Sequence, residues 1–226
     1  MRRAVILGGT GGIGRAAARR LLVSGWHVEV SARDVRRMPR DMIEAGVVFH
    51  AADRRDAAAT AALLARGAEL LVDCLCFSAS DARALLPSLG AVGSTVMISS
   101  KAVYVDDEGR HVNSDERPRF GGPIPESQPT MAPGDGEVDS REGYGSNKVG
   151  AERTLLDSGH PVTVLRASKV HGEGAAPPRE WVFVKRVLDR RRALFLARRG
   201  ESIDHTTAAA NLARLIEHVA ARPGPV

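Results

Sequence analysis

The chain has 226 residues, 43% of them hydrophobic and 26% charged, so its length allows one large domain or one domain with a small lobe. This composition is that of an ordinary globular protein. The net charge is +5, but 28 of the 32 basic residues are arginine, and acidic residues are interspersed among them. Since a nucleic-acid surface gathers its positive charge on one face, we do not expect nucleic acid as a partner.

Apolar runs and helical patterns alternate from the N-terminus onward. The first apolar run, AVIL, is too short for a signal peptide or a membrane span. We expect six strands, at residues 3–9, 27–33, 47–53, 69–77, 94–100 and 161–168. Helices are expected between them, at residues 12–25, 35–46 (broken by a proline), 57–67, 80–90 and 142–159. This alternation with short connections predicts an α/β fold with a doubly wound parallel sheet.

Two regions depart from the alternation. Residues 106–140 form a long insertion rich in proline, glycine and charge, and we expect a mobile substrate cover there. The C-terminal part predicts a helix, a short strand and another helix, which we interpret as a small substrate lobe. The expected domains are therefore 1–168, including the insertion, and 169–226.

The only cysteines, Cys74 and Cys76, are expected on the fourth strand. We expect these two thiols neither to pair with each other nor to hold a metal together. Two free thiols suit a reducing compartment, so we expect a cytoplasmic protein.

A glycine-rich stretch, VILGGTGGIGRAA, joins the first strand to the first helix. Gly8, Gly11 and Gly14 fit the spacing GxxGxxG, whereas Gly9, Gly11 and Gly14 fit GxGxxG, and the spelling leaves both open. Glycines here allow a tight turn and a close approach to a pyrophosphate, which the free N–H groups at the helix start attract. The stretch predicts a Rossmann-type dinucleotide site whose contacts are Gly8, Gly11, Gly12, Ile13 and Gly14.

The end of the second strand bears on the choice of dinucleotide. An NAD site usually has Asp or Glu at this point, but Ala32 stands there and Arg33 follows it. A guanidinium can bind a 2′-phosphate through two hydrogen bonds, so NADP is favoured. NAD is the alternative, because a shift of one residue would place Asp34 where the acid is expected.

Three further segments, VMISSKAVY, YGSNK and VLRASKVHG, follow the glycine loop in order. Together they resemble the extended short-chain dehydrogenase/reductase family, the NAD(P)-dependent epimerases and dehydratases. The resemblance covers nearly the whole chain. It implies that Ser100 is a catalytic hydroxyl, with Ser99 as the alternate, and that Tyr144 and Lys148 form the YxxxK pair. The segment HAADRRD resembles the one whose acid contacts the adenine, which implies Asp53.

The chemistry of these side chains agrees with the resemblance. Positions i and i+4 share a helix face, so Tyr144 and Lys148 can reach one site. A phenol titrates near pH 10, and moving its pKa to neutrality requires about 4 kcal/mol. A neighbouring ammonium supplies part of this, and the lysine can also hold the nicotinamide ribose. Ser100 would donate a hydrogen bond to the substrate oxygen.

The sequence also departs from the family pattern. Ser100 and Tyr144 are 44 positions apart, longer than the family commonly shows, and the insertion carries the excess. Lys169 and His171 stand where the family often has Asn and Tyr, which argues against a nucleotide-sugar substrate. The chain stops at ARPGPV, earlier than family members usually do, so it is either a reduced member or an incomplete sequence.

We therefore expect an NAD(P)-dependent oxidoreductase or epimerase that acts on a secondary alcohol or ketone, which could be derived from a sugar. The alternative is a non-catalytic dinucleotide-binding protein of the same family with a regulatory or RNA-binding role. The expected partner is a small-molecule substrate, without a metal or a membrane, and a homodimer is left open. Substrate identity, and the choice among epimerase, dehydratase and reductase, lie beyond the sequence.

Overall fold

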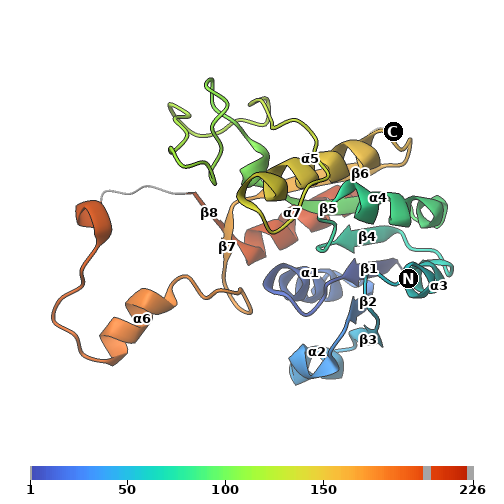
Figure 1. Cartoon of the computed structure of the whole chain (residues 1–226). Helices are drawn as coiled ribbons and strands as arrows, with labels where there is room; N and C mark the ends of the chain where they lie inside the picture. The colour runs from blue at the N-terminus through green and yellow to red at the C-terminus, as the bar shows by residue number, and fades with distance from the viewer. Residues whose placement is uncertain (1, 201–204, 223–226) are drawn as a thin grey trace.

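The computed structural model describes residues 2–200 and 205–222. Six parallel strands form one sheet in the order β3-β2-β1-β4-β5-β6, with helices on both faces (Figure 1). The strands are β1 Arg3–Leu7, β2 His27–Ala32, β3 Val48–Ala51, β4 Leu70–Asp73, β5 Thr95–Ser100 and β6 Val162–Ala167. The helices are α1 Gly12–Val23, α2 Arg40–Glu44, α3 Ala57–Leu64, α4 Ala79–Leu85, α5 Arg141–Leu156, α6 Trp181–Leu188 and α7 Ala209–Ala221. The predicted Rossmann-type fold is confirmed.

The two faces of the sheet bury alternate residues of each strand. On β1, Ala4 and Ile6 belong to the core formed with α1 and α7, whereas Val5 and Leu7 belong to the core formed with α3, α4 and α5. All four side chains are fully buried. Because both faces are covered, the strands read as continuous apolar runs, which is typical of parallel sheets.

The chain reverses its direction of winding at β1, which lies between β2 and β4. In open α/β sheets, ligands bind at the carboxyl ends of the strands beside such a switch point. The loops that follow Leu7 and Asp73 therefore lie where a cofactor is expected.

The fourth strand is shorter than predicted. It ends at Asp73, whose side chain accepts a hydrogen bond from the backbone N–H of Leu75 at 2.8 Å. Cys74 and Cys76 thus lie in the loop beyond the strand, and their predicted place on it was wrong. Both are free thiols, and burial raises the pKa of Cys76 to about 12.

The insertion is organised around one buried carboxylate. Asp106 is 5% exposed and accepts hydrogen bonds from the backbone N–H groups of Glu108, Arg110 and Arg119. Further along, the insertion packs apolar side chains against the end of β5 and against α5, namely Phe120, Ile124 and Met131. The segment has no sequence periodicity because hydrogen bonds to a single side chain, rather than a repeating ladder, hold its first half.

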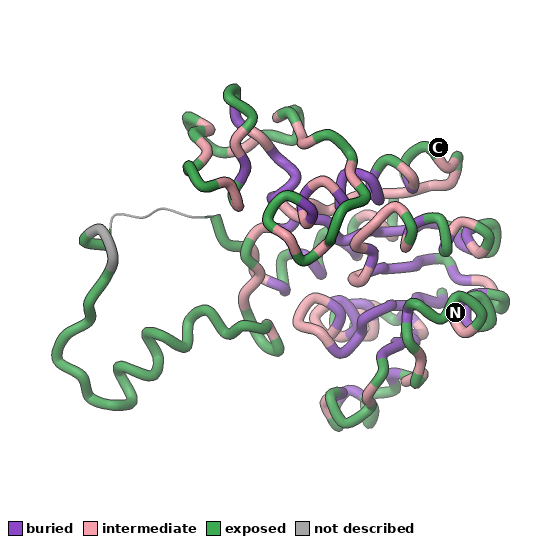
Figure 2. The backbone as a smooth tube through the Cα atoms, viewed as in Figure 1, coloured by how far each residue is buried: buried purple, intermediate pink, exposed green. Residues whose placement is uncertain are grey.

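The range predicted as a C-terminal lobe contains two differently placed parts. Helix α7 packs on α1, and its Leu212 and Ile216 are buried in the core of the sheet. Strands β7 (Lys169–His171) and β8 (Thr206–Ala208) pair in a second, two-stranded sheet. Helix α6 instead projects away from the body and is exposed along its length (Figures 1 and 2). The domain boundary at residue 168 stays a prediction.

A buried glutamate links the first three strands at the edge of the sheet. Glu29 on β2 is 1% exposed and contacts Arg3 on β1 at 2.7 Å and His50 on β3 at 2.7 Å. The hydrogen bond from Arg3 lowers the pKa of Glu29 to about 2. Between its folded pKa and its ordinary value, the unfolded chain binds the proton more tightly, so stability falls as the pH drops through this window.

We expect Glu29→Gln to flatten the acid limb of the stability profile. The carboxylate contributes fully above about pH 4.5 and loses its contribution towards about pH 2, which amounts to at most about 3 kcal/mol before screening by solvent. Urea unfolding at a series of pH values measures this directly. The exposed Glu44→Gln serves as the control. A Glu29→Gln profile as steep as that of the parent would contradict the assignment.

Candidate active site

The backbone of the glycine loop requires glycine at positions 8 and 14. Gly8 adopts a positive φ of 87°, which favours glycine. A Cβ on Gly14 would lie 2.5 Å from the Gly8 carbonyl oxygen and 2.7 Å from the Gly9 Cα, so helix and loop can pack only with glycine at position 14. Gly11 precedes the helix and offers no side-chain cap. The N–H groups of Gly12, Ile13 and Gly14 therefore have no acceptor within the helix and are suited to an anion.

A cavity of about 570 Å³ opens beside this loop. Four of the predicted cofactor-binding residues line it, Gly8, Gly11, Arg33 and Asp53. Ala32, which precedes Arg33, lines it as well. Asp34 also lines it, but its carboxylate accepts from the backbone and side chain of Arg36, each at 3.0 Å. The carboxylate of Asp34 is thus already engaged, whereas Arg33 is exposed on the cavity.

Sequence reasoning missed the ion pair that Arg54 forms in the wall of this cavity. Arg54 is 5% exposed, and its guanidinium contacts the fully buried Asp73 at 2.7 Å. The same guanidinium donates to the carbonyl of Asp81 at 3.0 Å. The pair therefore fixes the loops after β3 and β4 relative to each other. A lone acid at the end of the apolar run LLVD was the available signal.

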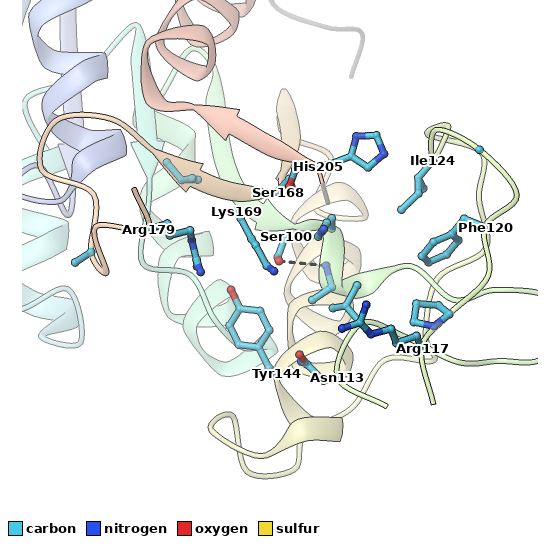
Figure 3. Close-up of a pocket in the computed structure, with 17 residues that line it drawn as sticks. Ser100, Asn113, Arg117, Phe120, Ile124, Tyr144, Ser168, Lys169, Arg179 and His205 are labelled. Carbon is cyan, nitrogen blue, oxygen red and sulfur yellow. Dashed lines mark hydrogen bonds between the residues drawn. The ribbon is translucent and has the colours of Figure 1, made fainter. Parts of the chain in front are cut away.

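A second cavity, of about 870 Å³, brings Ser100 and Tyr144 together (Figure 3). Ser100 ends β5, and its Oγ accepts from the Ala102 N–H at 3.2 Å, which leaves the hydroxyl proton available for another acceptor. Ser99 does not line the cavity. Its hydroxyl donates to Glu152, which is 2% exposed and pairs with Arg166 at 2.7 Å.

Helix α5 carries Tyr144 close to the turn after Ser100. Ser140 caps the helix by accepting from the Gly143 N–H at 2.9 Å. A Cβ on Gly145 would lie 2.6 Å from the carbonyl oxygen of Ala102. Glycine at position 145 therefore allows α5 to lie directly against the turn, and this brings the phenol of Tyr144 to the cavity.

Lys148 is placed differently from Tyr144. It is 2% exposed and lines neither cavity. Its Nζ donates to the carbonyls of Cys76 at 2.7 Å and Ile98 at 2.9 Å, and lies 4.2 Å from the ring centroid of Phe77. Burial lowers the pKa of Lys148. Because Phe77 also lines the cofactor cavity, the ammonium lies just behind the wall of that cavity.

The remaining walls of the Tyr144 cavity come mostly from outside the glycine loop and the YGSNK segment. The insertion and the C-terminal part supply most of its polar and aromatic lining: Asn113, Arg117, Phe120, Lys169, Arg179 and His205. The insertion thus forms part of the cavity wall, as expected of a substrate cover, and its mobility stays a prediction. Only its length indicated a role in the site.

Over residues 2–200 and 205–222, no group of three or more His, Cys, Asp or Glu side chains is arranged to hold a metal ion. In the same residues, no helix combines the length and the apolar character that crossing a bilayer requires.

Comparison with known proteins decides the family. The model of the NAD dependent epimerase/dehydratase family matches residues 4–205. The chain belongs to this family. It is accordingly an NAD(P)-dependent enzyme of the short-chain dehydrogenase type, as the glycine loop and the YGSNK segment predicted. A search of curated proteins found no match.

Solved structures share the fold of this chain. A UDP-glucose-4-epimerase from Stenotrophomonas maltophila, with bound NAD and formylated UDP-arabinopyranose, has a TM-score of 0.72 at 19% identity, covering 97% of this chain and 73% of its own. The Bordetella bronchiseptica enzyme WbmH, in complex with NAD+, has a TM-score of 0.70 at 16% identity, covering 99% and 74%. A Veillonella parvula short-chain dehydrogenase/reductase in complex with NADP has a TM-score of 0.62 at 14% identity, covering 98% and 88%.

Proposed function

We propose that this protein is an NADP-dependent oxidoreductase or epimerase that acts on a secondary alcohol or ketone through Ser100, Tyr144 and Lys148. The observation that carries the proposal is that Ser100 and Tyr144, 44 positions apart, line one cavity at the carboxyl edge of the sheet. The glycine loop lies at the same edge, so a dinucleotide there would face the same reacting carbon.

Each of the three side chains has a distinct role. Tyr144 takes the proton of the substrate hydroxyl, or returns it to the carbonyl oxygen in the reverse direction. Ser100 donates a hydrogen bond from its hydroxyl to the same oxygen, which holds the substrate in register. Lys148 supplies a positive charge one turn along α5, which favours the phenolate, and the one ammonium N–H that the carbonyls of Cys76 and Ile98 leave over would hold the nicotinamide ribose. The nicotinamide, when bound, supplies the hydride chemistry.

The cofactor cavity supports NADP over NAD. Arg33 is exposed at its edge, and Ala32 leaves room beside the ribose. The carboxylate that could accept from a 2′-hydroxyl, Asp34, is occupied by Arg36. A 2′-phosphate would pair with Arg33 without displacing any of these contacts. Asp53, on the same cavity, is left to contact the adenine.

Replacing Arg33 with Ala is expected to weaken NADPH binding about tenfold or more and to leave NADH binding nearly unchanged. The reason is that only NADPH carries the phosphate that the guanidinium would bind. Fluorescence titration of both cofactors against the parent and the variant measures the ratio. Equal losses for the two cofactors would show that Arg33 does not recognise the phosphate.

The proposal as a whole is tested by titrating NADPH fluorescence and then measuring turnover with a panel of ketones and sugars. Cofactor binding with turnover on a member of the panel supports it. Cofactor binding without turnover on any substrate, together with measurable affinity for RNA, would favour the regulatory or RNA-binding alternative. Absence of any cofactor binding would refute both functions.

A further inference from the structure

The Tyr144 cavity is lined by two arginines, Arg117 and Arg179, and no Asp or Glu stands among the described residues that line it. Arg117 and Arg179 make no hydrogen bond or ion pair with any described residue. Figure 3 shows their side chains entering the cavity from opposite sides of Tyr144. The cavity therefore offers two guanidinium groups to a ligand.

The acids beside Arg117 in sequence are engaged elsewhere. Asp115 pairs with Arg141 at the start of α5, and Glu116 pairs with Arg110 at 3.3 Å. The neighbour of Arg179, Glu180, contacts His171 at 3.3 Å. In each case the nearest carboxylate is held by a different basic residue, so neither guanidinium is neutralised by its own neighbour.

The backbone around Arg117 is fixed. The Arg119 N–H donates to the buried Asp106 at 2.8 Å, and Arg110, which holds Glu116, also contacts Asp106 at 2.8 Å. His111, 3% exposed, contacts Glu142 on α5 at 2.8 Å. These contacts tie the segment that carries Arg117 to the helix that carries Tyr144. A ligand group held by Arg117 would thus lie at a set place relative to the phenol.

We propose that the substrate carries an anionic substituent, a carboxylate or a phosphate, and that Arg117 binds it in the Tyr144 cavity, with Arg179 as a second positive charge in the same cavity. The inference rests on the proposed function in placing the substrate in this cavity. A planar guanidinium binds either anion through two hydrogen bonds.

The test uses three probes with one carbon skeleton and one secondary alcohol: glycerol 3-phosphate, glycerate and glycerol. Their binding to the parent is titrated by ligand-observed NMR. We expect at least one of the two anions to bind about tenfold more tightly than glycerol, and Arg117→Gln to remove most of that difference. Whichever anion gains more identifies the substituent. Arg119→Gln is the matched control, because it removes one charge from the same segment but does not line the cavity.

Two further variants separate the outcomes. Arg33→Ala should keep the preference for the anion, because Arg33 lines the cavity beside the glycine loop and not the Tyr144 cavity. If Arg33→Ala loses the preference, the anion binds in the cavity beside the glycine loop, and the inference is overturned. Tyr144→Phe should also keep the preference, even if Tyr144 proves to have no catalytic role. Equal affinity for the three probes, no binding of either anion at millimolar concentration, or an unchanged preference in Arg117→Gln would overturn the inference and leave the proposed function standing.

Discussion

Replacing Tyr144 with Phe is expected to lower turnover by about 10²–10⁴-fold, the usual cost of losing a general acid or base. The phenyl ring keeps its contacts on α5, so folding and NADPH affinity should stay close to those of the parent. Single-turnover rates and a cofactor titration on the same preparation separate the two effects. The variant removes one oxygen atom from a half-buried side chain, so any change in the rate reports on chemistry.

The other tyrosine provides the control. Tyr104 is 5% exposed, stacks under Arg166 at 4.9 Å and does not line the cavity. Tyr104→Phe loses the same hydroxyl group outside the site, and its turnover should fall far less. If Tyr144→Phe turns over as fast as the parent, the YGSNK segment has only a structural role in α5. The non-catalytic function would then be favoured.

Replacing Lys148 with Met is expected to affect chemistry, cofactor binding and folding together. The carbonyls of Cys76 and Ile98 would lose a buried donor, which costs about 1–3 kcal/mol of unfolding free energy. Turnover should fall by at least about tenfold, and NADPH should bind more weakly, because the fixed charge and the ribose donor are both lost. Urea unfolding, cofactor titration and turnover measure the three effects.

The exposed Lys185→Met on α6 controls for the loss of a positive charge. If Lys148→Met lowers only stability, with turnover and NADPH affinity intact at a temperature where the variant is folded, the lysine only holds the loop after β4 to strand β5 and has no part in catalysis.

The sheet and the positions of its helices could be predicted because apolar period and glycine spacing are local properties of the sequence. The glycines at the start of α1 could be predicted for the same reason. The family resemblance in addition predicted that Ser100 and Tyr144 share one site, and both line one cavity. The burial of Lys148 could not be predicted, because its two acceptors lie in the loop after β4 and on β5, far away in the chain. Nor could the sequence show that β4 ends at Asp73, since the pairing of Asp73 with Arg54 is a tertiary contact.

The wall formed by the insertion was beyond prediction for a related reason. A segment held by one carboxylate has no period to detect, so Arg117 looked like any surface arginine. Whether Arg117 is available to a ligand depends on which neighbouring acids are already paired with other basic residues. That can be seen only when the side chains are placed.

In the insertion, the residues that hold the backbone to Asp106 differ from those whose side chains line the Tyr144 cavity. The anchoring hydrogen bonds come mainly from backbone N–H groups, which every residue except proline provides, and so they constrain the identity of few side chains. Positions such as Asn113, Arg117 and Phe120 can therefore be exchanged while the path of the chain is kept. A library randomised at these three positions, with Asp106 retained, would be a practical starting point for redirecting the enzyme to new substrates.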